Sequence, residues 1–247
     1  MKSWIAFWNI LKKDAKTYYL KPPNISWGIV FPLSWTLMQI IRSSGEMDLS
    51  DIRDMLPGLM AMSVLFGTTS MLAVTITFER KGHSFDRLLL APVSLGTMVA
   101  AKLSGAILFG LLNAFVPVLF TAFFVDLAGI NWGVALLAVF LIAVTSTLLG
   151  LMIAVSANEV FEAQTFSNFF RFPMLFLCGL FLPIGSLPVF LRPLSYLLPL
   201  TYGTDLLKGA VLDINMLPPV LSIVILLVFS ITLFTFCQYG IRRKWIL

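Results

Sequence analysis

Long apolar stretches with almost no charge are the feature that most constrains this chain. Six of them contain a single charged residue, Arg171, and they cover residues 25–41, 56–78, 103–125, 132–155, 166–184 and 217–239. A bilayer core needs about 20 apolar residues per helix. Charged residues make up only 12% of the 247 residues, whereas a soluble domain carries about 25%. The pattern predicts an all-α membrane protein with six transmembrane helices.

The distribution of basic residues predicts the orientation of these spans. On the alternation that six spans imply, thirteen of the seventeen Lys and Arg residues fall on one side: in the N-terminal segment, in 79–102, at Arg171 and in the C-terminal tail. Loops rich in Lys and Arg stay in the cytoplasm. Both termini are therefore expected to be cytoplasmic, with the acidic 42–55 loop outside. The net charge of +5 does not indicate nucleic-acid binding, because the basic residues flank spans and form no single face.

The N-terminal segment, residues 1–22, predicts an amphipathic helix that lies in the membrane interface. Its lysines interrupt any continuous apolar region, which excludes a cleavable signal. A basic helix with tryptophans on its apolar side is typical of interfacial helices. The alternative is a solvated leader that folds against the protein. The apolar side is formed by Trp4, Phe7, Trp8, Leu11, Ala15 and Tyr18.

The sequence contains none of the motifs that would give the chain its own chemistry. There is no G-x-x-x-x-G-K-[ST], no H-E-x-x-H and no G-x-S-x-G, and there is one histidine. Cys178 and Cys237 lie in apolar runs without metal-ligand spacing. Arg171 is expected near a span end, from which its side chain can reach the surface. We expect no catalytic residue, no metal and no cofactor in this chain. The scarcity of ionisable groups in the spans also argues against ion-coupled transport.

A charged segment, FERKGHSFDRLLLAPVS at residues 78–94, interrupts the apolar sequence. Gly82 permits a turn and Ser84 is a candidate N-cap for a short helix that ends before Pro92. Asp86 in the first turn suits the positive end of that helix. Phe85, Leu88 and Leu89 would form its apolar ridge. The alternative interpretation is an ordinary solvated turn whose charges follow the positive-inside rule.

Two motifs carry a resemblance to a known family. The first is the run E-R-K-G-x-x-x-D-x-L-L-L-A-P-V-S, followed by Ala101-Lys102, and the second is LSYLLPLTYGTDLLKGA, with Pro199, Tyr202 and Asp205. The first is similar to the loop between spans two and three of the ABC-2 type transporter permeases, and the second resembles the pattern of this family before the last span. His83-Ser84-Phe85 departs from the pattern, since a small residue is expected soon after the glycine.

The resemblance implies that residues 79–100 form a cytoplasmic coupling loop, which seats in a groove of a separate ATP-binding subunit. Glu79, Arg80 and Asp86 would then make polar contacts with that subunit, and Phe85 and Leu88 would form an apolar plug. Glu159 and Glu162, in the turn after the fourth span, would make a second, weaker contact. The complete set expected at the coupling site is Glu79, Arg80, Lys81, Gly82, Phe85, Asp86, Arg87 and Leu88.

The proline-rich residues 185–215 are too apolar for a free external loop. Irregular backbone at membrane depth is tolerated only where it is buried or lines a cavity, and the related family implies short re-entrant helices between spans five and six. The alternative is an outer loop lying on the lipid headgroups. Four phenylalanines near this segment are candidates for lining the transport path, although Phe in a span often only contacts lipid. They are Phe169, Phe170, Phe176 and Phe181.

Together these features predict a single transmembrane domain, residues 1–247, in a prokaryotic inner membrane. The resemblance implies a non-enzymatic permease subunit of an ABC exporter. It would act as a homodimer, or with a sibling permease, and with two copies of an ATPase that holds ATP and Mg. An amphipathic drug, a lipid or a lipid-linked glycan would be the substrate. The alternative is an ATP-independent membrane scaffold or assembly factor that docks a cytoplasmic partner.

Overall fold

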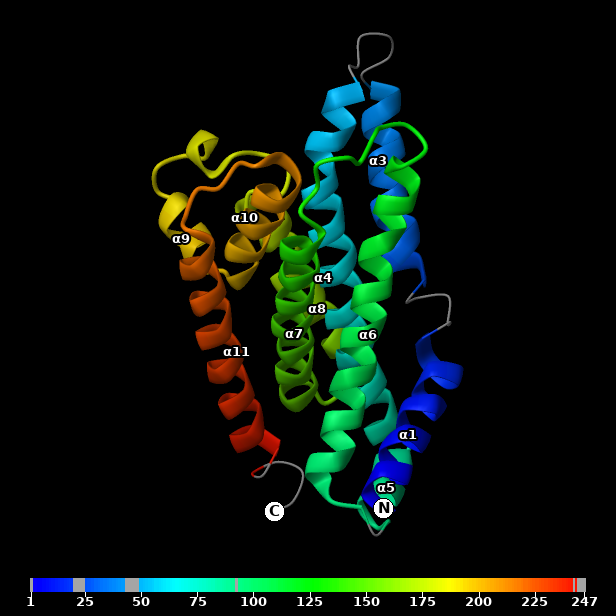
Figure 1. The fold of residues 1–247 in the computed structure, drawn as a ribbon. Helices are drawn as coiled ribbons and strands as arrows, with labels where there is room; N and C mark the ends of the chain where they lie inside the picture. The colour runs from blue at the N-terminus through cyan, green and yellow to red at the C-terminus, as the bar shows by residue number, and fades with distance from the viewer. Residues whose placement is uncertain (1, 20–24, 43–48, 92, 242, 244–247) are drawn as a thin grey trace.

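The computed structural model describes residues 2–19, 25–42, 49–91, 93–241 and 243, and all regular structure in these residues is helical (Figure 1). The predicted all-α class is therefore confirmed. The elements are α1 (Lys2–Asp14), η1 (Ala15–Tyr19), η2 (Ser26–Val30), α3 (Phe31–Arg42), α4 (Leu49–Lys81), α5 (Ser84–Leu89), α6 (Leu95–Thr121), α7 (Trp132–Ser156), α8 (Val160–Leu177), η3 (Ile184–Ser186), α9 (Arg192–Tyr196), α10 (Pro199–Leu212) and α11 (Pro219–Ile241).

Four helices of the described part are long and apolar enough to cross a membrane: α4 from Ile52 onward, α6, α7 and α11. They differ in how deeply they are packed. The most apolar window of α4 is 94% buried, whereas that of α11 is 22% buried. Helix α4 packs against α6, α7, α8 and α10, and α7 also packs against α11. The bundle is thus built around α4 and α7, with α11 at its periphery.

Several helix ends differ from the predicted spans for local reasons. Helix α6 begins at Leu95 instead of residue 103, because the Ser94 side chain caps it by accepting from the Thr97 N–H. Helix α8 is shifted toward the N-terminus relative to 166–184, and it ends before Gly179, which has a φ of +73°. Helix α4 extends into the predicted 42–55 loop, where Ile52 is buried and Arg53 donates to the Ala128 carbonyl.

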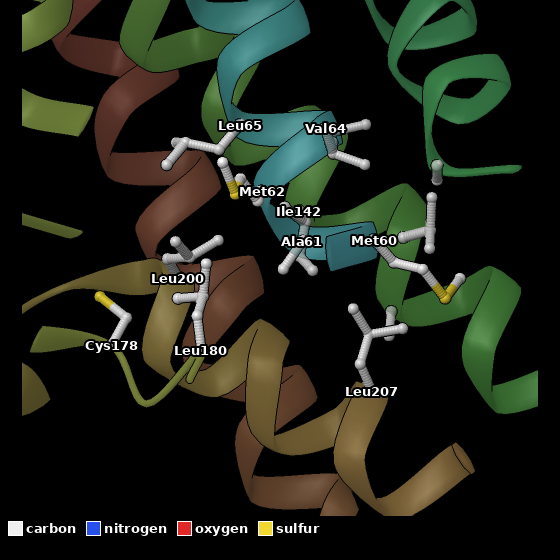
Figure 2. Packing of buried hydrophobic residues seen from close by; sticks show 14 of the residues in the cluster. Met60, Ala61, Met62, Val64, Leu65, Ile142, Cys178, Leu180, Leu200 and Leu207 are labelled. Atoms are coloured by element: carbon white, nitrogen blue, oxygen red, sulfur yellow. The ribbon is translucent and has the colours of Figure 1, made fainter. Parts of the chain in front are cut away.

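The main hydrophobic core lies where α4, α7 and α10 meet. Figure 2 shows Met62 and Leu65 of α4 near Ile142 of α7, with Leu200 of α10 and Leu180 of the segment after α8 completing the cluster. These side chains are at most 4% exposed. The core therefore ties the segment between α8 and α11 to the two inner helices.

The two ends of the bundle carry different elements. Helix α5, the start of α1 and the end of α11 lie at one end, and α9 and α10 lie toward the other (Figure 1). The residues expected to re-enter the membrane contain η3, α9 and α10. The longest of these, α10, has 14 residues, which gives about 21 Å and is too short to cross a bilayer core. The predicted end of the N-terminal helix at residue 22 falls outside the described residues.

Candidate functional site

The predicted short helix of the charged segment exists as α5, and Gly82 lies in the turn before it, as predicted. His83, the next residue, has the left-handed backbone conformation, with φ of 55°. Ser84 is the first helical residue and not the N-cap, and its hydroxyl donates to the Glu79 carbonyl at 3.2 Å. The hydroxyl therefore satisfies the end of α4 instead of the start of α5.

The structure separates the expected coupling residues into an inner and an outer set. Glu79 and Phe85 are buried, with 0% and 2% of their surface exposed. Neither side chain is open to solvent in the single chain, and the polar contact of Glu79 and the plug role of Phe85 stay predictions. Lys81, Gly82, His83, Arg87 and Leu90 are exposed, Arg80 and Leu88 are partly buried, and the Asp86 side chain falls outside the described part.

Glu79 belongs to a closed ring of alternating charges, which we call the charge ring: Lys13, Asp14, Glu79 and Lys102. Lys102 Nζ lies 3.0 Å from Asp14 Oδ2 and 2.5 Å from Glu79 Oε2, and Lys13 Nζ lies 3.0 Å from Asp14 Oδ1 and donates to Glu79. The residues come from α1, α4 and α6. The ring therefore joins three helices at the point where α4 leads into α5.

Three members of the charge ring are buried, and only Lys13 reaches solvent. The side chains of Asp14, Glu79 and Lys102 are at most 3% exposed, against 37% for Lys13. Burial lowers the pKa of the Lys13 amine, but the hydrogen bond to Glu79 and the charges of Asp14 and Glu79 outweigh burial and raise it. Lys13 therefore stays positively charged at neutral pH. Lys13, Asp14 and Lys102 were not among the predicted site residues, although Lys102 lies in the family motif.

A second set of contacts joins the coupling segment to the turn between α7 and α8. Arg80 Nη1 donates to the carbonyls of Ala154 and Ala157 at 3.1 and 3.2 Å, at the end of α7. Lys81 forms an ion pair with Glu159. Glu162 instead accepts from the Asn158 N–H at 2.9 Å, at the start of its own helix. The structure thus brings Glu159, but not Glu162, onto the predicted coupling segment.

Contrary to the expectation, the Arg171 side chain does not reach the surface. It is fully buried, its Nη1 donates to the Phe66 carbonyl at 3.1 Å and its Nε to the Ser167 carbonyl at 3.1 Å. Its guanidinium also lies 4.7 Å from the centre of the Phe66 ring. Because Phe66 is near the middle of α4, Arg171 attaches α8 to the middle of α4.

The four candidate path residues do not gather on one surface. Phe169 and Phe176 are 70% and 53% exposed on the outside of α8. The Phe169 ring packs edge-on against that of Phe170, which is partly buried. The Phe181 ring stacks on that of Trp35 of α3. Their assignment to a transport path remains a prediction.

The second motif organises the connection between α10 and α11. Asp205 is buried and accepts from the Met216 N–H at 2.7 Å, the Leu217 N–H at 3.3 Å and the Ser222 hydroxyl at 3.2 Å. The Tyr202 hydroxyl donates to the Tyr196 carbonyl at 2.7 Å, and Pro199 is the first residue of α10. These contacts give the motif a structural role.

These features define a class of protein: an all-helical membrane bundle with charged connections at one end. No group of three or more His, Cys, Asp and Glu side chains in the described ranges is arranged to hold a metal.

The profile of the ABC-2 type transporter family matches residues 5–212, and the chain belongs to this family. It is 29% identical over 250 residues to the inner membrane transport permease YadH of Escherichia coli, covering 97% of this chain and 96% of YadH. It is 27% identical over 178 residues to the probable multidrug ABC transporter permease YbhR of Escherichia coli, covering 68% of this chain and 48% of YbhR. Nodulation protein J of Sinorhizobium fredii is 27% identical over 160 residues, 63% of this chain and 60% of that protein. Permeases of this family are membrane components of ABC transporters and work with ATP-binding subunits.

Proposed function

We propose that this chain is the permease subunit of an ATP-driven exporter, in which two copies of the chain assemble with two copies of an ATP-binding subunit. The observation that carries the proposal is the position and exposure of α5. This short helix lies at one end of the bundle, carries the exposed Arg87 and is flanked by the exposed Lys81 and Leu90. Its Phe85 is buried, and the charge ring lies at the end of α4 that leads into it. An exposed, rigidly held helix suits the transfer of motion from a partner.

The lengths and positions of the helices support a proposed membrane arrangement. Four helices are long enough to span, and we propose that η2 with α3, about 25 Å, and α8, about 27 Å, complete six spans. With an even number, both termini lie on one side, as do the start of α1 and the end of α11 (Figure 1). The Lys and Arg residues of α1, α5 and the start of α6 favour the cytoplasm for that side. The helices η3, α9 and α10 would then re-enter from outside.

Substrate and direction are proposed from the relatives. The names of YbhR and nodulation protein J refer to multidrug transport and nodulation, and the apolar bundle suits an amphipathic drug, a lipid or a lipid-linked glycan. We propose movement of such a molecule out of the cytoplasm or the inner leaflet. The alternative function, an ATP-independent scaffold, requires the same docking surface but no stimulation of ATP hydrolysis.

Co-purification tests the docking surface. A variant with Arg87→Glu and Leu90→Asp should lose the ATP-binding subunit that co-purifies with the unmodified chain, because the outer face of the α5 segment is altered. A matched control is Val189→Asp, which places a charge at an exposed position toward the other end, 75% exposed. Equal recovery of the subunit with both variants would contradict docking at α5. A complex that forms without stimulated ATP hydrolysis would favour the scaffold.

A further inference from the structure

The charge ring needs an explanation other than stability. Removing a charge from water costs several kcal/mol per ion, and buried ion pairs are often no more stable than apolar side chains of similar volume. Asp14, Glu79 and Lys102 are all nearly fully buried. The best-attested use of buried charges is to specify how elements are aligned. The ring is therefore suited to fixing the alignment of the helices that supply it.

Those helices surround the base of α5. The Glu79 carbonyl, next to the ring, accepts from Ser84 at the start of α5. Phe85 of α5 belongs to a buried cluster with Ile10 of α1 and with Met98 and Ala101 of α6. Helix α5 therefore packs mainly on α4 and shares a buried cluster with α1 and α6.

Helix α1 has a second face that points away from the bundle. Trp4 and Trp8 are 65% and 50% exposed, whereas Ile10 and Asp14 are buried. Tryptophan is enriched where one end of the side chain is apolar and the other is wet, as at a membrane interface. One face of α1 therefore packs on α6 and shares a buried cluster with α5, and the other is suited to lipid.

We propose that α1 and α5 move as a single unit, and that Asp14, Glu79 and Lys102 are positioning residues that set its alignment. The inference rests on the proposed docking of an ATP-binding subunit at α5. Movement imposed on α5 would then reach the membrane surface through α1, in addition to entering the bundle through α4. Slippage of α1 by one turn, about 5.4 Å, would break contacts of 2.5 to 3.0 Å in the ring, whereas apolar contacts tolerate such slippage better.

An apolar replacement of the ring separates alignment from stability. The quadruple variant Lys13→Met, Asp14→Leu, Glu79→Leu and Lys102→Met keeps similar volumes and should keep a thermal midpoint close to that of the unmodified chain. It should still bind the ATP-binding subunit, because Arg87 and Leu90 are unchanged. Stimulation of ATP hydrolysis by the bound permease should fall at least tenfold. Lys13→Arg, which keeps the charge, is the control and should keep full stimulation.

A second readout is independent of any partner. Single cysteines at Asn9, which is exposed, and Ile10, which is 6% exposed, report the orientation of α1 by maleimide labelling. The native Cys178 and Cys237 are buried and give little background. With the ring intact, position 9 should label at least tenfold faster than position 10. In the apolar variant this difference should shrink to a few-fold.

The outcomes separate this inference from the proposed function. If the unmodified chain binds no ATP-binding subunit, the proposed function fails. The role of the charge ring in aligning α1 is then tested by the maleimide labelling of positions 9 and 10 alone. If the apolar variant keeps both the labelling difference and the ATPase stimulation, the ring is only structural and the inference is overturned. Should that variant not fold, the charge-balanced pair Glu79→Leu with Lys102→Met replaces it, with the same two readouts.

Discussion

The contact between α4 and α7 leads to a prediction in which two opposing effects can be compared. Gly150 of α7 faces the backbone of Thr69 in α4. A Cβ atom at Gly150 would lie 2.6 Å from the Thr69 carbonyl oxygen and 3.2 Å from its Cα. Because these are backbone atoms, no side-chain rotation can relieve the clash. Gly150→Ala must therefore push the two inner helices apart by several tenths of an ångström.

The direction of the change in unfolding free energy follows from comparing helix propensity with overpacking. Alanine stabilises a helix interior by about 0.5–1 kcal/mol relative to glycine. Overpacking a close-packed interior costs about 1–3 kcal/mol. The net result should be a destabilisation of about 1–2 kcal/mol, or about 2–8 °C in thermal midpoint at about 2–4 °C per kcal/mol for a chain of this size.

Thermal unfolding of the detergent-solubilised chain measures this effect. The matched control is Gly96→Ala in α6, where an added Cβ meets no atom within 4 Å. That variant should be at least as stable as the unmodified chain, because only the helix propensity changes. A Gly150→Ala variant as stable as the control would refute the close α4–α7 packing.

Three further substitutions test buried polar contacts by the same measurement. Glu79→Gln should cost about 3–5 kcal/mol, because it leaves an excess buried positive charge. Adding Lys102→Gln should recover part of that loss. If the stability losses of the two substitutions simply added, the result would argue against the charge ring. Arg171→Met should cost about 1–3 kcal/mol, because it removes the hydrogen bonds that Arg171 donates to the carbonyls of Phe66 and Ser167. An unchanged midpoint would show that α8 is held to α4 by other contacts. Asp205→Asn leaves one side-chain oxygen for the donors of the α10–α11 turn and should cost about 1–2 kcal/mol; a neutral result would contradict the role given to this motif.

The sequence was a good guide to the helices and a poor guide to their contacts. Uninterrupted apolar runs located α4, α6, α7 and α11, because each of them is apolar over the length of a membrane span. The ends were harder, since a local cap at Ser94 or a left-handed Gly179 decides where a helix starts or stops. Helix α5 and the turn at Gly82 were expected from local signals, but the left-handed conformation of His83 was not.

The interior of the candidate site could not be predicted in the same way. Lys13 and Glu79 are separated by 66 positions in the chain and Asp14 and Lys102 by 88, so no local pattern shows that they meet. A charged residue at the end of an apolar run was therefore interpreted as a surface residue. The alternation of charge signs among these four residues becomes visible only when α1 is placed against α4 and α6.

The two electrostatic attachments of the coupling segment differ in their exposure to salt. Lys81 and Glu159 form their ion pair with side chains 53% and 52% exposed, and salt at physiological strength screens exposed charges over about 8 Å. The buried pairs of the charge ring are screened much less. Raising ionic strength should therefore weaken the Lys81–Glu159 ion pair, while the hydrogen bonds from Arg80 to the Ala154 and Ala157 carbonyls and the attachment of α1 remain. Salt should thus loosen the α7–α8 turn on the coupling segment without affecting the charge ring.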